Sequence, residues 1–126
     1  MPTNIARKFF SRRVSITGGA AISYANLMRS AAAVTGTPVW GTNSDGSTSL
    51  DSFIGDGATL IPVTESIWVG YDAQVKNVNA AGSYVGVPTV ATQPFNLADY
   101  FRPVDTDNVF LFSVNTQDVD LIFQGL

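Results

Sequence analysis

The second half of the chain alternates short apolar runs with turn-forming residues, and this pattern constrains the fold most. The runs have strand length and are rich in β-branched and aromatic side chains. They span residues 59–63, 67–71, 73–76, 84–87, 109–114 and 119–123. Glycine, asparagine and aspartate fill the intervals between them. Because no βαβ repeat is visible, we predict an all-β fold, mainly an antiparallel, jelly-roll-like β-sandwich, with an open barrel as the alternative.

Two segments of the first half add to this prediction. Residues 14–17 alternate apolar and polar side chains, which indicates a first strand, and a Gly-Gly pair ends it. Residues 20–34 have helical periodicity, with a glycine and a proline beyond them as stop signals. The apolar face of this segment consists of Tyr24, Leu27, Met28, Ala31 and Ala32. We expect one short N-terminal helix that caps one end of a sheet.

The charges are divided unevenly along the chain. Residues 1–44 contain five of the seven basic residues and none of the ten acidic residues. A basic segment is attracted to acidic protein surfaces or nucleic acid, while an acidic body stays soluble. We therefore divide the chain into an extended basic N-terminal arm, residues 1–13, and a single β-sandwich domain, residues 14–126. Deletion of residues 1–13 is expected to leave a folded domain that no longer binds its partner.

The predicted arm carries the candidate binding residues. Basic side chains surround two adjacent aromatic rings in the set Arg7, Lys8, Phe9, Phe10, Arg12 and Arg13. Such a segment suits stacking on nucleic acid. It equally suits docking on acidic grooves of a protein lattice, with the rings as hydrophobic anchors. We favour the protein partner over nucleic acid, because the whole chain has a net charge of −3 and shows no nucleic-acid-binding fold signature.

Catalytic and metal-binding patterns are weak. Without cysteine or histidine, the chain lacks thiolate nucleophiles, imidazole bases and zinc–cysteine sites. An EF-hand count from Asp45 to Asp56 fails at position 6, where Leu50 replaces glycine. Asp105 and Asp107 could bracket a cation, although aspartate is common in turns without any metal. A cation near either aspartate group stays an alternative to the metal-free prediction.

Enzyme activity is not expected from the acidic residues. Carboxylate pairs for glycoside hydrolysis could be drawn from Asp56, Glu65, Asp72 and Asp99, but any ten acids allow such pairs. We predict no enzyme activity and no cofactor. Trp40 and Trp68 are expected in the core, and an exposed tryptophan would instead suit stacking on a sugar. Because no apolar run has the length of a membrane span or a signal peptide, we expect synthesis in a cytoplasm and no membrane contact.

Three strand motifs carry a resemblance to a known class of protein. They are Ile-Trp-Val-Gly at 67–70, Asp-Asn-Val-Phe-Leu at 107–111 and Val-Asp-Leu-Ile-Phe at 119–123. With the entry segments 14–17 and 22–27, they resemble small β-sandwich structural proteins of tailed bacteriophage virions. The resemblance covers residues 14–126 and leaves the predicted arm outside it. It implies a non-enzymatic virion component with no catalytic residues.

The resemblance implies most specifically a capsid decoration, or cement, protein. Such proteins sit on the outer surface of the capsid, often as trimers, and bridge neighbouring major capsid subunits. The implied partners are the major capsid protein and further copies of this chain, with a trimer favoured. The alternatives are a tail, baseplate or head–tail connector subunit of the virion, or a carbohydrate-binding module for host attachment.

Overall fold

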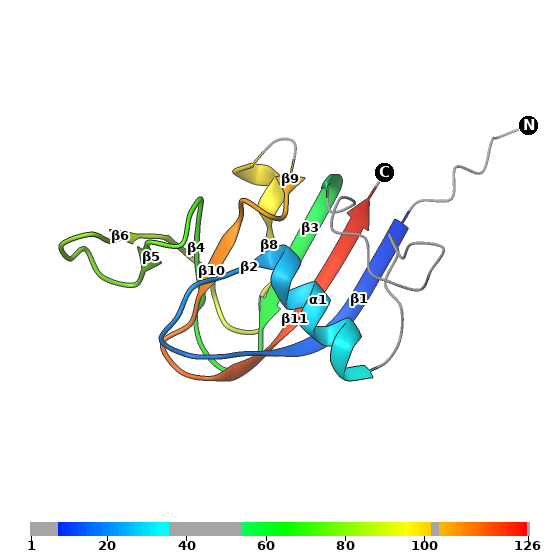
Figure 1. Cartoon of the computed structure of the whole chain (residues 1–126), viewed down its shortest axis with the longest axis horizontal. Helices are drawn as coiled ribbons and strands as arrows, with labels where there is room; N and C mark the ends of the chain where they lie inside the picture. The colour runs from blue at the N-terminus through cyan, green and yellow to red at the C-terminus, as the bar shows by residue number, and fades with distance from the viewer. Residues whose placement is uncertain (1–7, 36–53, 102–103, 126) are drawn as a thin grey trace, which may run out of the picture.

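The computed structural model describes residues 8–35, 54–101 and 104–125, and most of its strands form two antiparallel sheets. The large sheet has the strand order β1 (Lys8–Ile16), β11 (Gln117–Gly125), β3 (Ile54–Pro62) and β8 (Phe95–Asn96). A further short strand, β9 (Val104–Asp105), pairs with the start of β3. Figure 1 shows the three long strands side by side, with β11 in the middle.

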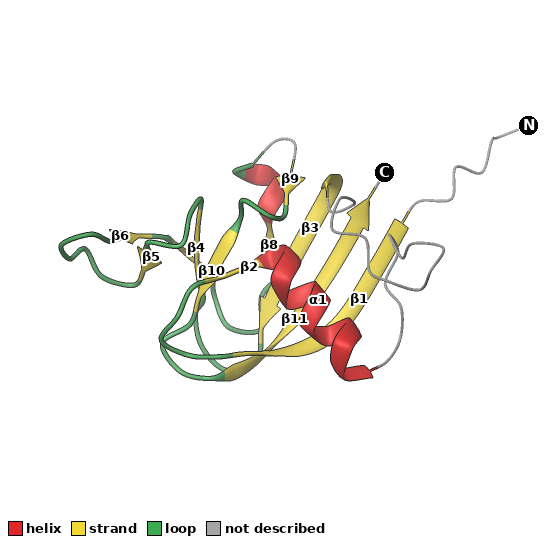
Figure 2. Cartoon of the chain, viewed as in Figure 1, coloured by secondary structure: helices red, strands yellow, loops and turns green. Residues whose placement is uncertain are grey.

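The small sheet has the strand order β2 (Ile22–Ser23), β10 (Phe110–Phe112), β4 (Trp68–Gly70) and β7 (Val87–Pro88). Two further strands, β5 (Val75–Lys76) and β6 (Tyr84–Val85), form a separate parallel pair. The only other regular elements in the described ranges are the helix α1 (Tyr24–Thr35) and the 3-10 helix η1 (Leu97–Asp99), which Figure 2 shows in red. The prediction of a mainly antiparallel β fold with one short N-terminal α-helix is thus confirmed, and the finer prediction of a jelly-roll-like sandwich stays a prediction.

Strand β11 shows why the large sheet has one buried face. Val119, Leu121 and Phe123 alternate along this strand and are fully buried, as their spacing predicts. Asp120 and Ile122 point to the opposite face and are only half-buried. The buried face belongs to one hydrophobic core that also includes side chains of the small sheet, among them Val69 and Leu111. A single core therefore holds both sheets and α1 together.

Helix α1 covers the buried face of the large sheet, whereas the sequence predicts a helix capping one end. Its first residue, Tyr24, is fully buried, and the ring centroids of Tyr24 and Phe123 lie 6.2 Å apart. The Tyr24 hydroxyl donates to the carbonyl oxygens of Thr59 at 2.9 Å and Ile122 at 3.1 Å. Leu27 and Met28 are also buried as predicted, while the side chains of Ala31 and Ala32 lie outside the described part.

The start of α1 is fixed by hydrogen bonds to the adjacent residue Ser23 and to two residues distant in the sequence. The Ser23 hydroxyl oxygen accepts from the Asn26 amide at 3.1 Å, which satisfies one of the free N–H groups of the first turn. The amides of Tyr24 and Ala25 donate to the carbonyl oxygens of Val109 and Thr106 at 2.9 and 3.0 Å. These contacts explain why the helix begins at residue 24, and why residues 22–23 form a strand instead of a helical turn.

The predicted boundary between arm and domain, between residues 13 and 14, falls inside strand β1. Lys8–Ile16 pairs residue by residue with β11, so Lys8–Arg13 belong to the large sheet. The buried positions Val14 and Ile16 alternate along β1, and the same register continues back to Arg12, which lies opposite Leu121. The strand therefore begins before the predicted boundary. Residues 1–7 lie outside the described part, as does Trp40.

Candidate protein-binding surface

Strand β1 brings the described basic residues of the predicted binding set to one border of the large sheet. Ser11, Arg13 and Ser15 are exposed on one face of the strand. Val14 and Ile16 are buried on the other face, against the core. Arg12 shares the core-facing register with Val14 but is exposed, since β1 is the border strand of the sheet order. Arg12 is thus available to a partner at the border of the sheet.

Arg13 is already paired within the chain. It lies opposite Asp120 in the register, and its guanidinium donates twice to that carboxylate, from Nε at 2.7 Å and from Nη2 at 2.9 Å. The hydrogen bond from Arg13 and the charge of its guanidinium hold the pKa of Asp120 below its usual value. Reciprocally, the pKa of Arg13 is raised, chiefly by this hydrogen bond and then by the charge of Asp120. Because an arginine has five N–H donors, three remain for a further acceptor.

The other members of the predicted set are placed by register alone. Lys8, Phe9 and Phe10 lie opposite Gly125, Gln124 and Phe123 in β11. Their side chains, like the whole of Arg7, lie outside the described part of the chain. The structure therefore places Arg12 and Arg13 next to each other on β1, and the binding roles predicted for all six residues stay predictions.

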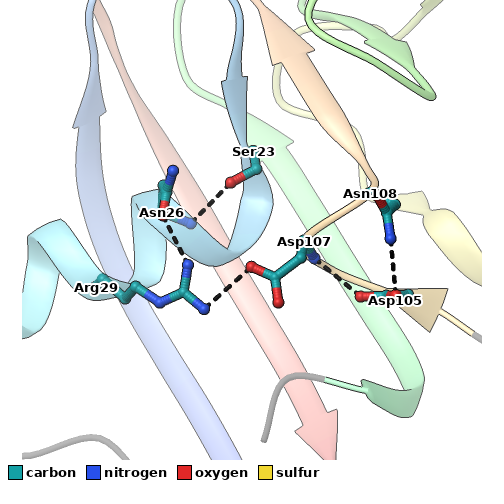
Figure 3. A network of polar contacts seen from close by, with 6 residues as sticks. All are labelled: Ser23, Asn26, Arg29, Asp105, Asp107 and Asn108. Atoms are coloured by element: carbon teal, nitrogen blue, oxygen red, sulfur yellow. Dashed lines mark hydrogen bonds and ion pairs between the residues drawn. The ribbon is translucent and has the colours of Figure 1, made fainter. Parts of the chain in front are cut away.

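Asp105 and Asp107, the alternative cation ligands, have protein partners (Figure 3). The Asp105 carboxylate accepts from the side-chain amide of Asn108 at 2.8 Å and from the backbone amide of Asp107 at 3.2 Å. Asp107 forms an ion pair with Arg29 of α1 at 3.0 Å. Arg29 also donates to the Asn26 side chain at 2.7 Å. This network ties the β9–β10 turn to the first turns of α1, which is a structural role for both aspartates.

The remaining acidic candidates show no catalytic arrangement in the described ranges. The Glu65 carboxylate accepts from the backbone and side-chain amides of Asn115, each at 3.1 Å. The Asp72 carboxylate accepts from the Gln74 amide at 2.8 Å, a local turn contact. No cluster of three or more acidic side chains suited to a metal ion occurs in the described residues. The carboxylate side chains of residues 45, 51 and 56 lie outside them.

A projecting loop, residues 71–86, is a surface feature that the sequence analysis did not single out. Figure 1 shows its strands β5 and β6 extending away from both sheets. The Tyr84 hydroxyl accepts from the amides of Tyr71 at 2.8 Å and Asp72 at 3.0 Å, and the two tyrosine rings stack at 4.6 Å. Tyr71 is nevertheless 64% exposed, and Val78 and Val85 are 51% and 50% exposed. Two tyrosines flanking a segment with three alanines and two asparagines were the available signal.

Comparisons of the chain with protein-family models, with curated proteins and with solved structures found no match. Within the described ranges, no helix is long and apolar enough to cross a membrane. Trp68, the candidate for sugar stacking that the structure describes, is half-buried in β4 of the small sheet. The two surfaces that bear on function are therefore β1 and the projecting loop.

Proposed function

We propose that the chain is a non-enzymatic structural protein of a tailed-bacteriophage virion. In this proposal it is a capsid decoration protein that binds the lattice of the major capsid protein on the outer surface of the head and stabilises it. The body is a jelly-roll-like sandwich that assembles as a homo-oligomer, with a trimer favoured. Synthesis takes place in the host cytoplasm, and no cofactor takes part.

The observation that carries the proposal is the exposed basic strand at the border of the large sheet. Arg12 is exposed there, and Arg13 retains N–H donors beyond those given to Asp120. The described carboxylates of Glu65, Asp105 and Asp107 accept hydrogen bonds or ion pairs from this chain. The exposed basic strand β1 therefore suits charge-assisted contacts with acidic groups of a protein lattice.

The projecting loop supports a second contact. Its exposed Tyr71, Val78 and Val85 offer apolar area, while Tyr84 holds the base of the loop through backbone amides. Exposed apolar side chains gathered on one segment are typical of protein–protein contacts. Two separate weak contacts on one module give avidity, because the second contact forms at a high effective concentration. We assign the loop to contacts between copies of the chain.

The test is co-sedimentation with empty, undecorated capsid shells. The full-length chain should bind saturably, with a copy number that follows the number of capsid subunits. Arg12→Glu should weaken binding at least about tenfold, since a charge reversal turns attraction into repulsion. Gln93→Glu is the control, because Gln93 is exposed outside both β1 and the projecting loop and gains a negative charge there. Deletion of residues 1–7 shows whether the segment before β1 contributes.

Each other outcome points away from the capsid surface. Absence of saturable binding by the full-length chain would overturn the decoration role. A small, fixed copy number in purified virions would indicate a tail, baseplate or connector position. Binding to glycans without any capsid protein, abolished by Trp68→Ala, would indicate carbohydrate recognition.

A further inference from the structure

In the described ranges, strand β1 has a backbone partner on one side only. It pairs with β11 over all nine residues without a register shift, and no described residue pairs with its other side. A long, regular strand with an unpaired side is a template for another extended segment, because its outward N–H and C=O groups need partners. The question is which backbone groups of β1 point outward.

Two hydrogen bonds next to the β3–β11 ladder show which backbone groups of β1 point outward. The Val63 amide donates to the Asp118 carbonyl oxygen at 3.1 Å, so the Asp118 backbone points toward the β3 side of β11. The Pro62 carbonyl oxygen accepts from the Thr92 amide at 2.7 Å, so Pro62, opposite Val119, points away from β11. In an antiparallel ladder the backbone direction alternates along each strand. Residues 119, 121 and 123 of β11 therefore direct their backbone groups toward β1.

The register transfers this alternation to β1. Arg12 and Val14 lie opposite Leu121 and Val119, so their backbone groups bond to β11. The intervening residues direct their N–H and C=O groups to the unpaired side, and they are Phe9, Ser11, Arg13 and Ser15. Ser11, Arg13 and Ser15 are exposed. The free side of β1 thus presents evenly spaced donors and acceptors for one added strand.

Nothing in the sequence of β1 blocks this side except charge. The strand contains no proline and no register shift, two devices that commonly protect a sheet border. It does contain Lys8, Arg12 and Arg13, and no acidic residue. In an antiparallel pairing of two copies over the whole strand, Arg12 would lie opposite Arg12 of the other copy, which is unfavourable. Charge therefore disfavours a second copy and favours an acidic segment.

We propose that the unpaired side of β1 binds an extended, acidic segment of a partner protein, which adds to the large sheet as a strand. Main-chain hydrogen bonds to residues 9, 11, 13 and 15 supply affinity, and carboxylates opposite Arg12 and Arg13 supply specificity. Arg13 takes part through the N–H groups that Asp120 leaves unused. The inference depends on the proposed function only in that the capsid protein would supply the segment.

The test uses the full-length chain and a fluorescent nine-residue threonine peptide with two adjacent glutamates at its centre, so that one carboxylate lies on each face of the added strand. Ser11→Pro removes one outward N–H but no bond to β11, so the large sheet is expected to stay intact. Peptide affinity, measured by fluorescence anisotropy, should fall at least about tenfold relative to Ser11→Ala, which retains the N–H. Ser15→Pro is the second variant, in case Ser11→Pro disturbs folding. The peptide with lysine in place of glutamate should not bind.

Hydrogen exchange locates the peptide. Its binding should slow amide exchange at residues 11, 13 and 15 and leave residues 12 and 14 unchanged, since those already bond to β11. Equal peptide affinity of both proline variants and Ser11→Ala would overturn the inference, and so would equal binding of the lysine peptide. Slow exchange at residues 11, 13 and 15 without peptide, in a dimer, would assign this side to a second copy instead.

The two proposals can fail separately. Peptide binding with the expected proline effect, but no binding to capsid shells, would support the strand-addition site and reject the capsid partner. Saturable shell binding that neither proline variant weakens would support the capsid partner and reject strand addition.

Discussion

Tyr24 joins the helix to the large sheet through one hydroxyl group. The side chain is fully buried, and its hydroxyl reaches carbonyl oxygens of two adjacent strands, β3 and β11. Burial raises the pKa of Tyr24, so the phenol stays a neutral donor across the ordinary pH range. At the scale of the residue, this one contact decides how α1 sits on the sheet.

Tyr24→Phe should therefore lower the free energy of unfolding by about 1 kcal/mol, because it removes a buried hydrogen bond and leaves the ring packing in place. Urea unfolding at neutral pH measures this difference. Tyr100→Phe is the matched control, since Tyr100 is largely exposed and its ring stacks on Phe95. Equal midpoints for the two variants would show that the Tyr24 hydroxyl is not a stabilising contact.

The Arg13–Asp120 pair makes stability depend on acid. The pKa of Asp120 is lower in the folded chain, so the pair contributes stability that is complete above the unfolded pKa of about 3.9 and is lost as the pH falls through the lower folded value. When the pH is lowered from about 5 into the acid range, the free energy of unfolding of Asp120→Asn should therefore fall less than that of the native chain. The effect should be small and weaken with salt, because the pair is exposed.

Urea midpoints at neutral pH and below the unfolded pKa of aspartate measure this dependence. Asp118→Asn is the control, since Asp118 lies on the same strand and its loss leaves the Arg13–Asp120 pair in place. The interpretation is wrong if Asp120→Asn and the native chain lose stability equally on acidification.

At the scale of the element, the turn after β1 shows how closely two segments approach. A Cβ atom added at Gly18 would lie 2.5 to 2.6 Å from backbone atoms of Asn115 and Thr116, which cannot move aside as a side chain can. Gly18→Ala should therefore destabilise the fold by about 1–3 kcal/mol. Gly57→Ala is the control, because nothing lies within 4 Å of its Cβ position. Thermal unfolding that gives both variants the same midpoint would contradict this reading.

The projecting loop depends on one side chain for its local order. Tyr84→Phe removes the oxygen that accepts from the Tyr71 and Asp72 amides, so both amides lose a partner. We expect faster amide exchange confined to residues 71–86, with little change in global stability, because the loop lies beyond the two sheets. Tyr71→Phe should leave exchange unchanged, since it retains the ring. Uniformly faster exchange across the large sheet would show that the loop is part of the global folding unit.

Local periodicity explains which elements could be predicted. The alternation in residues 119–123 and the helical spacing of Tyr24, Leu27 and Met28 report burial directly, so both faces are confirmed. The two-residue strands β2, β8 and β9 are too short to show any period. The predicted boundary at residue 13 falls inside β1 because a cluster of arginines looks solvated in sequence, whereas the partner of Arg13 lies 107 residues away. Arg12 and Arg13 could be found from charge, but their place on the border strand of the large sheet could not.

At the scale of the whole molecule, the first described strand is an integral part of the fold. Removal of residues 1–13 would take away six of the nine residues of β1 and uncover β11. This variant should be unfolded or aggregated, contrary to the expectation from sequence, while removal of residues 1–7 should leave a folded chain. Circular dichroism and size-exclusion chromatography of the two variants measure the difference. A folded, monomeric chain lacking residues 1–13 would show that β1 is dispensable.

The position of β11 between β1 and β3 has a consequence for how the protein is made. On the ribosome, β1 emerges long before β11, since Arg13 precedes Asp120 by 107 residues. Throughout that interval β1 lacks β11, its only strand partner in the described ranges, and the pairing that completes the large sheet is slow because it joins distant segments. The positive charges of β1 would keep the nascent strands of neighbouring chains apart during this time, so they protect the protein before it has a fold.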